Sequence, residues 1–254
     1  MEALHNLLFE IAGEDRLNIL LELKNKPLRL TNMSKKLGFT VQETSRNVSR
    51  LVDARLIEKD SDGRFSLTPY GEETLVLLEG FSFLSKYREY FASHTLSMLP
   101  KEFSSNIASL RDCELVEDVM VAFSNVESMI QNAEKYIWIL SNQILASTLP
   151  YLQEAVRRSV EFKLLLPKDV VPPKGAIEGM SAPVFFEAVK SGKMEIRSLD
   201  KIEVFLCLSD KEVGSLGFLN VDGKMNYHGF HGTGESSCKW TKALFLHYWD
   251  TAIR

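Results

Sequence analysis

The sequence has few cysteines, few residues typical of disordered segments, and no excess of basic charge. Its three cysteines, Cys113, Cys207 and Cys238, are widely spaced and odd in number, which argues against a disulfide framework or a four-ligand zinc site and favours a reducing cytoplasm. With 14 glycines, 8 prolines and 45% hydrophobic residues in 254, the composition indicates one large or two small globular domains. The formal net charge of −4 excludes a general nucleic-acid polycation.

A long apolar run is also missing. The longest uncharged stretch, residues 136–153, contains Ser141, Asn142 and Pro150, so no membrane span is predicted. Acidic residues from Glu2 onward interrupt the first apolar stretch, so no secretory signal is predicted. We therefore expect a soluble, cytoplasmic protein with no membrane partner.

The charge is unevenly distributed along the chain. Residues 29–64 hold eight basic and five acidic residues, so this segment is +3 while the remainder is −7. Such a segment can contact a polyanion, or it can be a solvated surface of mixed charge. The pattern of residues around the charges has to decide between the two.

Helical periodicity dominates the first part of this region. The predicted helices cover residues 4–11, 14–26, 32–37 and 40–54. Thr31 can cap the third helix and Gly38 can end it, whereas Thr40 can cap the fourth with Glu43 three residues later. The apolar residues of the fourth helix that are available for the core are Val41, Val48, Leu51 and Val52.

Only residues 38–40 separate the last two of these helices, which is a helix-turn-helix spacing. In that motif the second helix enters the DNA major groove, and short polar groups and arginines suit base edges and phosphates. A hairpin over residues 56–67 follows, with Arg64 at its tip. The predicted contacts to double-stranded DNA are Thr31, Thr40, Gln42, Thr44, Ser45, Arg46, Ser49, Arg50 and Arg64. A winged helix used for protein contacts is the alternative.

The residues of this region resemble those of archaeal ArsR-type transcriptional regulators. The resemblance covers residues 1 to about 75 and rests on four segments, residues 43–51, 56–60, 63–64 and 67–71. It implies a winged-helix DNA-binding domain over residues 1–72. Metal-sensing relatives use clusters of cysteine or histidine, and residues 6–93 contain no such cluster, so no metal site is predicted.

Residues 72–99 form another predicted helical stretch. Its apolar stripe consists of Leu75, Leu78, Phe81, Leu84, Tyr87 and Phe91. We expect residues 73–111 to link the domains and to form a homodimer, since operators usually mirror two-fold proteins. A linker helix that buries the stripe within one chain is the alternative.

From residue 112 the pattern alternates between helix and strand. The expected strands are residues 136–140, 162–166, 194–197, 202–208 and 213–219. The expected helices are residues 115–130, 149–156, 184–189 and 237–252. This alternation predicts an α/β domain over residues 112–254, with a sheet between helices.

A second resemblance extends over nearly the whole chain. Residues 83–94, 136–141, 222–224 and 240–249 are similar to archaeal regulators of the methanogenesis-regulator type. This implies an ArsR-like winged helix before a regulatory domain of phospholipase-D-like fold, as in TrmB-type sugar regulators. The phospholipase-D motif is His-x-Lys with Asp five residues later. His94, His228 and His231 do not begin such a motif, because none has a lysine two residues later. We therefore expect a catalytically degenerate domain with no catalytic residues and no cofactor.

A small-molecule effector is expected in the C-terminal domain. Because ligands of open α/β sheets bind beyond strand carboxyl ends, the residues at the end of the first strand are candidates, and a histidine pair in a glycine-rich segment adds to them. The predicted effector-binding residues are Trp138, Ser141, Asn142, Gln143, His228 and His231. A helix-capping loop and an ordinary mobile loop are the alternatives, and a metal site at the histidines with Cys238 fits no standard ligand spacing.

The resulting hypothesis is a homodimeric, sequence-specific DNA-binding transcriptional regulator whose C-terminal domain senses a metabolic signal. Two alternatives belong to other classes. One is a protein-interaction scaffold, and the other is a degenerate phosphodiesterase or nuclease.

Overall fold

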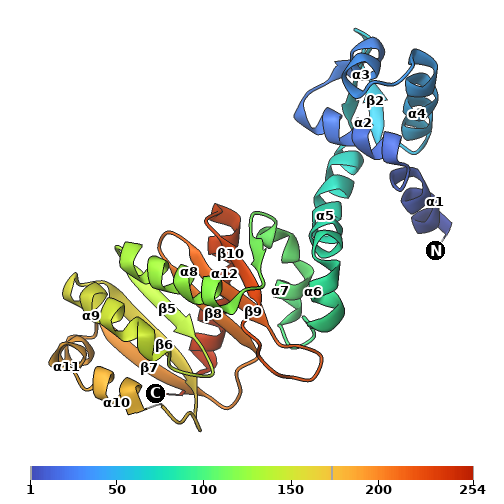
Figure 1. Cartoon of the computed structure of the whole chain (residues 1–254). Coiled ribbons are helices and arrows are strands. Elements are labelled where there is room, and N and C mark those ends of the chain that lie inside the picture. The colour runs from blue at the N-terminus through green and yellow to red at the C-terminus, as the bar shows by residue number, and fades with distance from the viewer. Residues whose placement is uncertain (1, 173, 254) are drawn as a thin grey trace. The chain divides into compact units, whose positions relative to one another are not determined.

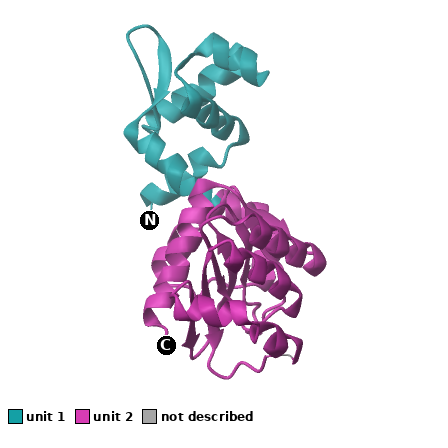
Figure 2. Ribbon diagram, turned by 90° about the vertical axis from the view of Figure 1, so that its left-hand side faces the viewer, with its two compact units in different colours: residues 1–81 teal, residues 82–254 magenta. Residues whose placement is uncertain are grey.

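The computed structural model describes residues 2–172 and 174–253, which form two compact units. The first unit covers residues 1–81 and the second residues 82–254 (Figure 2). The division lies within one helix, so the predicted linker segment 73–111 is shared between the units. The predicted fold class, a winged helix-turn-helix followed by an α/β domain, is confirmed.

The first unit consists of helices around a small antiparallel sheet. Its helices are α1 (Glu2–Ile11), α2 (Glu14–Asn25), α3 (Leu30–Leu37) and α4 (Val41–Asp53), followed by the start of α5 (Pro69–Lys86). Its strands are β1 (Leu28–Arg29), β2 (Ile57–Lys59) and β3 (Arg64–Leu67), in the order β1-β3-β2. Strands β2 and β3 are the predicted hairpin, the wing.

The core of the first unit is assembled from one face of each element. Ile19, Leu20, Met33, Leu51 and Leu56 are all completely buried. Each fully buried aliphatic side chain of this size stabilises the fold by about 1.5–3 kcal/mol relative to exposure. The core therefore fixes which face of α4 is left for solvent.

Two details of α3 and α4 correct the sequence analysis. Helix α3 begins at Leu30 after the N-cap residue Arg29, whose backbone is paired in β1, so Thr31 lies inside the first turn and does not cap it. In α4, Val41 and Val52 are exposed rather than part of the core. Val41 is the first residue of the helix and Val52 the last but one, and the buried face of α4 is formed by Thr44, Asn47, Val48 and Leu51 between them.

The end of the wing packs tightly against the two residues that precede β2. The Thr68 hydroxyl donates a hydrogen bond to the Arg55 carbonyl at 2.7 Å and accepts one from the Gly71 N–H at 3.0 Å. A Cβ atom at Gly71 would lie 2.0 Å from the Leu56 carbonyl oxygen. The Leu-Thr-x-x-Gly ending of the hairpin is thus explained, because only glycine allows this approach of two backbones.

The predicted helix over residues 72–99 is broken into pieces. Helix α5 ends at Lys86, α6 covers Arg88–Ser93, and α7 (Lys101–Ser105) and the 3-10 helix η1 (Ile107–Leu110) follow. Most of the predicted stripe packs within the chain, divided between two cores, but Phe81 is exposed. Leu75 belongs to the core of the first unit, whereas Leu84, Tyr87 and Phe91 pack on the core of the second.

The second unit is a seven-stranded mixed sheet in the order β4-β10-β9-β8-β5-β6-β7. The strands are β4 (Glu114–Val116), β5 (Tyr136–Leu140), β6 (Glu161–Pro167), β7 (Met194–Leu199), β8 (Val204–Ser209), β9 (Val213–Phe218) and β10 (Gly229–Gly232). Strands β5, β6 and β7 are parallel, and the other pairs are antiparallel.

Helices cover both faces of this sheet (Figure 1). One face packs against α8 (Val119–Asn132), α9 (Leu149–Arg157), α10 (Lys174–Met180) and α11 (Pro183–Lys190). The other face packs against α12 (Glu235–Thr251) and the segment from α6 to η1. This is the predicted sheet between helices.

Two predicted elements of the second unit are wrong. Residues 115–116 belong to β4, and the helix begins later, where the Asp118 carboxylate accepts the Met120 N–H at 2.8 Å. The glycine-rich segment 229–232 is a buried strand rather than a mobile loop. Its glycines are needed for close packing, since a Cβ atom at Gly229 would lie 2.2 Å from the Leu216 carbonyl oxygen.

Candidate nucleic-acid interface

The start of α4 is fixed by a capping box. The Thr40 hydroxyl accepts the Glu43 N–H at 3.2 Å, and the Glu43 carboxylate accepts the Thr40 N–H at 3.0 Å. The backbone hydrogen bond from Thr40, followed by the one from its hydroxyl, lowers the pKa of Glu43. Both side chains stabilise the helix end and set its angle, so Thr40, although exposed, is engaged within the helix.

A polar stripe follows on the solvent side of α4. It consists of Gln42, Ser45, Arg46 and Ser49, which are all exposed. Their spacing of i, i+3, i+4 and i+7 places them on one face of a helix. Val48 and Leu51 are buried on the opposite side and hold this stripe outward. Four of the predicted contacts are therefore presented together, and we call them the α4 stripe.

Thr44 does not belong to this surface, which corrects the prediction. Its side chain is completely buried, and its hydroxyl donates a hydrogen bond to the Thr40 carbonyl at 2.9 Å. A threonine that bonds back to the preceding turn of its own helix satisfies its hydroxyl locally. Thr44 thus supports the fold of α4 and cannot reach a ligand.

Arg50 is a second correction, because it is held by α1. Its guanidinium donates two hydrogen bonds to the Glu10 carboxylate, at 3.0 Å from Nε and 2.7 Å from Nη2. It also lies over the Phe9 ring, 5.1 Å from the ring centre. The hydrogen bond with Glu10 raises the pKa of Arg50. A bidentate pair of this kind is a strong and directional contact, so Arg50 is a structural residue in this state.

Glu10 is shared between two arginines. Arg16 Nε lies 3.1 Å from the Glu10 carboxylate and donates to the Glu10 backbone carbonyl at 2.6 Å. Sequence reasoning missed this role of α1, because Glu10 and Arg50 are forty residues apart. The available signal was the acidic side chain of Glu10 near the end of an amphipathic helix.

The wing presents Arg64 at its tip. Its backbone N–H donates to the Asp60 carboxylate at 2.7 Å, and Gly63 takes the left-handed conformation (φ 77°) that the turn requires. The Arg64 side chain is exposed. Thr31 is exposed as well, in the first turn of α3. The first unit therefore offers the α4 stripe with Arg64 and Thr31 on neighbouring elements of the same small fold.

The predicted effector residues of the second unit do not converge on one site. Trp138 faces α12, where its ring stacks on Phe245 at 5.1 Å and its indole N–H donates to Glu161 at 3.0 Å. Asn142 accepts a hydrogen bond from the Tyr227 hydroxyl at 2.7 Å. Trp138 is thus part of the core of the sheet rather than a ligand contact.

His228 directly follows Tyr227, whereas His231 lies in a separate strand. His228 contributes its carbonyl to the Tyr90 hydroxyl at 3.2 Å. His231 is in β10, where its Nε2 lies 3.9 Å from the Glu212 carboxylate. Strands β8 and β9 separate β10 from β5, which ends at Leu140, just before Ser141. In the described part of the chain no group of three metal-binding side chains gathers around either histidine.

Ser141 and Gln143 line an apolar cavity beyond the end of β5. Their own polar groups close a turn, in which the Ser141 hydroxyl donates to the Gln143 carbonyl at 2.7 Å. The cavity lies between the sheet and helices α8 to α11, and its volume of about 30 Å³ accommodates one water-sized molecule. Side chains such as Leu149, Phe185 and Phe205 form its walls.

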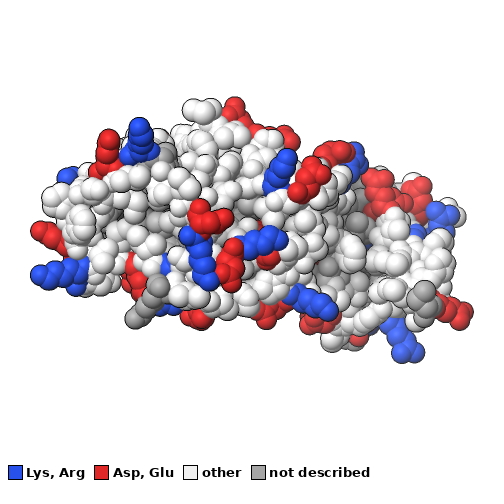
Figure 3. All heavy atoms as spheres, turned by 90° about the horizontal axis from the view of Figure 1, so that it is seen from below, with Lys and Arg blue, Asp and Glu red and all other residues white. Residues whose placement is uncertain are grey.

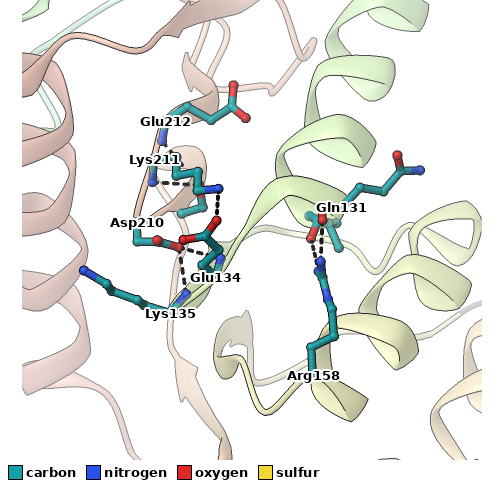
Figure 4. A network of polar contacts seen from close by, with 9 residues as sticks. Gln131, Glu134, Lys135, Arg158, Asp210, Lys211 and Glu212 are labelled. Carbon is teal, nitrogen blue, oxygen red and sulfur yellow. Dashed lines mark hydrogen bonds and ion pairs between the residues drawn. The ribbon is translucent and has the colours of Figure 1, made fainter.

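A polar network fixes the opposite end of β5 (Figure 4). The Asp210 carboxylate accepts the backbone N–H groups of Glu134 and Lys135, both at 3.0 Å. Partial burial would raise the pKa of Asp210, but these backbone hydrogen bonds outweigh it and lower the pKa. Lys211 Nζ lies 2.6 Å from the Glu134 carboxylate. The network holds the β8–β9 turn against the start of β5.

Surface charge gives no second candidate on the face that Figure 3 draws, where lysines and arginines alternate with acidic side chains. No helix in the described residues is both long enough and apolar enough to cross a membrane.

Comparison with known proteins finds similarity only among solved structures. No protein-family model matches the chain, and no curated protein does. The structure of TrmBL2, an archaeal chromatin protein described as showing a novel mode of DNA binding, is 15% identical over 95% of this chain and 94% of its own, with a TM-score of 0.45. Nuc from Salmonella typhimurium, a phospholipase D family member, is 14% identical over 55% of this chain and 95% of its own, with a TM-score of 0.41.

NucT from Helicobacter pylori is 12% identical and covers 56% of this chain and 96% of its own, with a TM-score of 0.41. A phospholipase-D-like fold is what the sequence resemblance implied for the C-terminal domain. At this distance the function has to be argued from the residues of this chain.

Proposed function

We propose that the chain is a sequence-specific DNA-binding transcriptional regulator that reads duplex DNA with the α4 stripe. The observation that supports this most is the exposed run of Gln42, Ser45, Arg46 and Ser49 on the second helix of a helix-turn-helix. Amide, hydroxyl and guanidinium groups match the donors and acceptors of base edges in the major groove. Arg64 on the wing is placed to add a phosphate or minor-groove contact.

The experiment that tests this is selection of bound duplexes from random sequence with the full chain, followed by titration of the selected site at several salt concentrations. A DNA-binding winged helix predicts an enriched motif and an affinity that falls steeply with salt, because phosphate contacts release counterions. Arg157→Ala, which removes an exposed arginine on α9, is the matched control and leaves the salt slope unchanged. Selection without any enriched motif contradicts the proposal and favours a protein-interaction scaffold.

The proposed regulator is a homodimer, but through a surface that shares only Phe81 with the predicted stripe. The rest of that stripe is buried or half-buried, whereas α5 exposes Val76, Leu77 and Phe81, the last two at 72% and 68%. Helix α1 exposes Leu4 and Leu8 in addition. Exposed apolar helix faces of this kind are typical of interfaces between subunits. A Leu77→Glu variant that sediments at half the mass of the parent supports this surface; a variant that keeps the mass of the parent contradicts it.

The proposed regulatory input is a small apolar effector in the cavity beside Ser141. A ligand larger than one water requires the turn over residues 141–148 or α10 to move, and such a movement would let ligand binding shift a conformational equilibrium. The test is a thermal-shift screen of cell metabolites, with Leu149→Trp as the variant that fills the cavity. Loss of the shift in this variant supports the cavity as the site.

We further propose that the chain acts in the cytoplasm as an archaeal regulator of the ArsR-like, methanogenesis-regulator type, without enzymatic activity. The absence of a His-x-Lys motif in the sequence supports the last point. A nuclease assay with added divalent metals tests it. DNA cleavage that also occurs with a His228→Ala, His231→Ala variant would contradict a purely regulatory role.

A further inference from the structure

Strand β7 lies at the edge of the seven-stranded sheet, and in the described part of the chain no named strand pairs with its outer side. Only Ser198 is paired there, through a bridge in which its N–H donates to the Ile253 carbonyl at 2.7 Å and its carbonyl accepts the Ile253 N–H at 2.9 Å. An open strand edge is a template for another chain, and natural proteins usually cover it, twist it or charge it.

The outward backbone groups of β7 can be assigned from its pairing with β6. The Lys193 carbonyl accepts the Phe162 N–H at 2.8 Å, and the Leu199 carbonyl accepts the Lys168 N–H at 3.0 Å. Because the backbone groups of successive residues point to alternate sides of a strand, the odd-numbered residues of β7 face β6. Met194 and Ile196 therefore direct their backbone N–H and C=O groups to the open edge.

An apolar groove runs beside this edge, between β7 and α11. Its volume is about 290 Å³, and Met194, Ile196, Phe186 and Val189 are among the residues that line it. Phe186 is 68% exposed and Val189 54% exposed. An open strand edge next to an apolar groove has the features of β-augmentation, in which main-chain hydrogen bonds give affinity and a pocket takes side chains.

The charge pattern of β7 indicates what pairs with it. Glu195 and Arg197 lie on the same face of the strand, with Arg197 Nη2 2.9 Å from the Glu195 carboxylate. If a second β7 pairs antiparallel about a two-fold axis at Ile196, Glu195 of each copy lies opposite Arg197 of the other. Opposite charges directly across two strands stabilise the pairing, and a self-complementary patch gives a closed two-fold contact.

We propose that the occupant of this edge is a second copy of the chain, joined through antiparallel β7–β7 pairing centred on Ile196. The bridge from Ile253 to Ser198 limits the ladder, so it consists of the Ile196 pair flanked by two Glu195–Arg197 pairs. Phe186 and Val189 of both copies are covered beside it. This interface is separate from the α5 surface and does not depend on DNA binding.

Charge exchange tests the proposal on the full chain by sedimentation. Glu195→Lys and Arg197→Glu should each lower the sedimented mass, because like charges then lie opposite each other across the two strands. An equimolar mixture of the two variants should restore a one-to-one assembly, because only unlike chains then place opposite charges across the strand pair. Glu154→Lys, an exposed change on α9, is the control and should leave the mass unchanged. Since Arg197 also donates to the Trp249 carbonyl at 2.9 Å, thermal unfolding checks that its variant is folded.

Cysteine cross-linking tests the register independently. In a Cys238→Ser background, Ile196→Cys should form a disulfide between two copies, because the Cα atoms of a hydrogen-bonded antiparallel pair are about 5.5 Å apart, which is within disulfide range. Glu195→Cys should not form this disulfide, since position 195 of one copy lies opposite Arg197 of the other. A parent chain whose mass equals that of Glu195→Lys, or an Ile196→Cys chain that does not cross-link, overturns the proposal. An extended peptide as the occupant predicts both of these results.

Discussion

The comparison of Arg46 with Arg50 is the sharpest test of how α4 contacts DNA. Both arginines belong to the polar side of the helix, four residues apart, but Arg46 is exposed, whereas Arg50 is half-buried and bound by Glu10 through two hydrogen bonds. We therefore expect Arg46→Ala to weaken binding to the selected duplex much more than Arg50→Ala does.

The size of the effect follows from the kind of contact that is lost. A bidentate arginine contact to a guanine edge is worth about 1–3 kcal/mol, which corresponds to about a fivefold to 150-fold loss of affinity and a relaxed preference at one base position. A phosphate contact instead weakens all sequences alike and reduces the salt slope by about 1. Arg50→Ala should lower thermal stability, since it leaves Glu10 with Arg16 alone, and should keep the base preference.

Fluorescence anisotropy of labelled selected and scrambled duplexes at three salt concentrations measures the affinity for each duplex and its salt slope. Far-UV circular dichroism checks the fold. Glu10→Gln adds a useful third variant, because it weakens the hold on Arg50 without changing the α4 stripe. If Arg50→Ala costs more affinity than Arg46→Ala while the fold remains intact, the assignment of the α4 stripe is refuted. Arg50 would then leave Glu10 on binding DNA.

Three further predictions concern single sites. Gly71→Ala should lower the melting temperature strongly, because its Cβ would lie 2.0 Å from a carbonyl oxygen, whereas Gly175→Ala, whose Cβ would come no closer than 3.8 Å to another group, should not. Asp210→Asn should destabilise the chain at neutral pH, and the deficit should shrink as the pH falls below about 4, because a carboxylate of lowered pKa stabilises only while it is ionised. Burial raises the pKa of Cys113 to about 11 and that of Cys207 further, so neither should react with iodoacetamide at pH 8 until urea unfolds the chain.

Local signals in the sequence were sufficient for the winged helix. The capping box at Thr40, the glycine turn after α3 and the hairpin before Gly71 each act within a few residues, so the pattern alone predicts them. In the C-terminal domain the strands with long apolar runs, such as 136–140, were recognised for the same reason. The segment 229–232 was missed because glycines that permit close strand packing look like glycines of a loop.

The candidate site was predictable only where it depends on the helix itself. The face of α4 follows from its periodicity, and four of its residues are exposed together. The orientation of the Arg50 side chain depends on its contact with Glu10 in α1, and no local sequence pattern predicts this contact. Thr44 was placed on the surface by residue type, although its position between Val48 and the cap turns it inward. Trp138 was similarly misplaced, because strand alternation gives two faces and does not say which one meets α12.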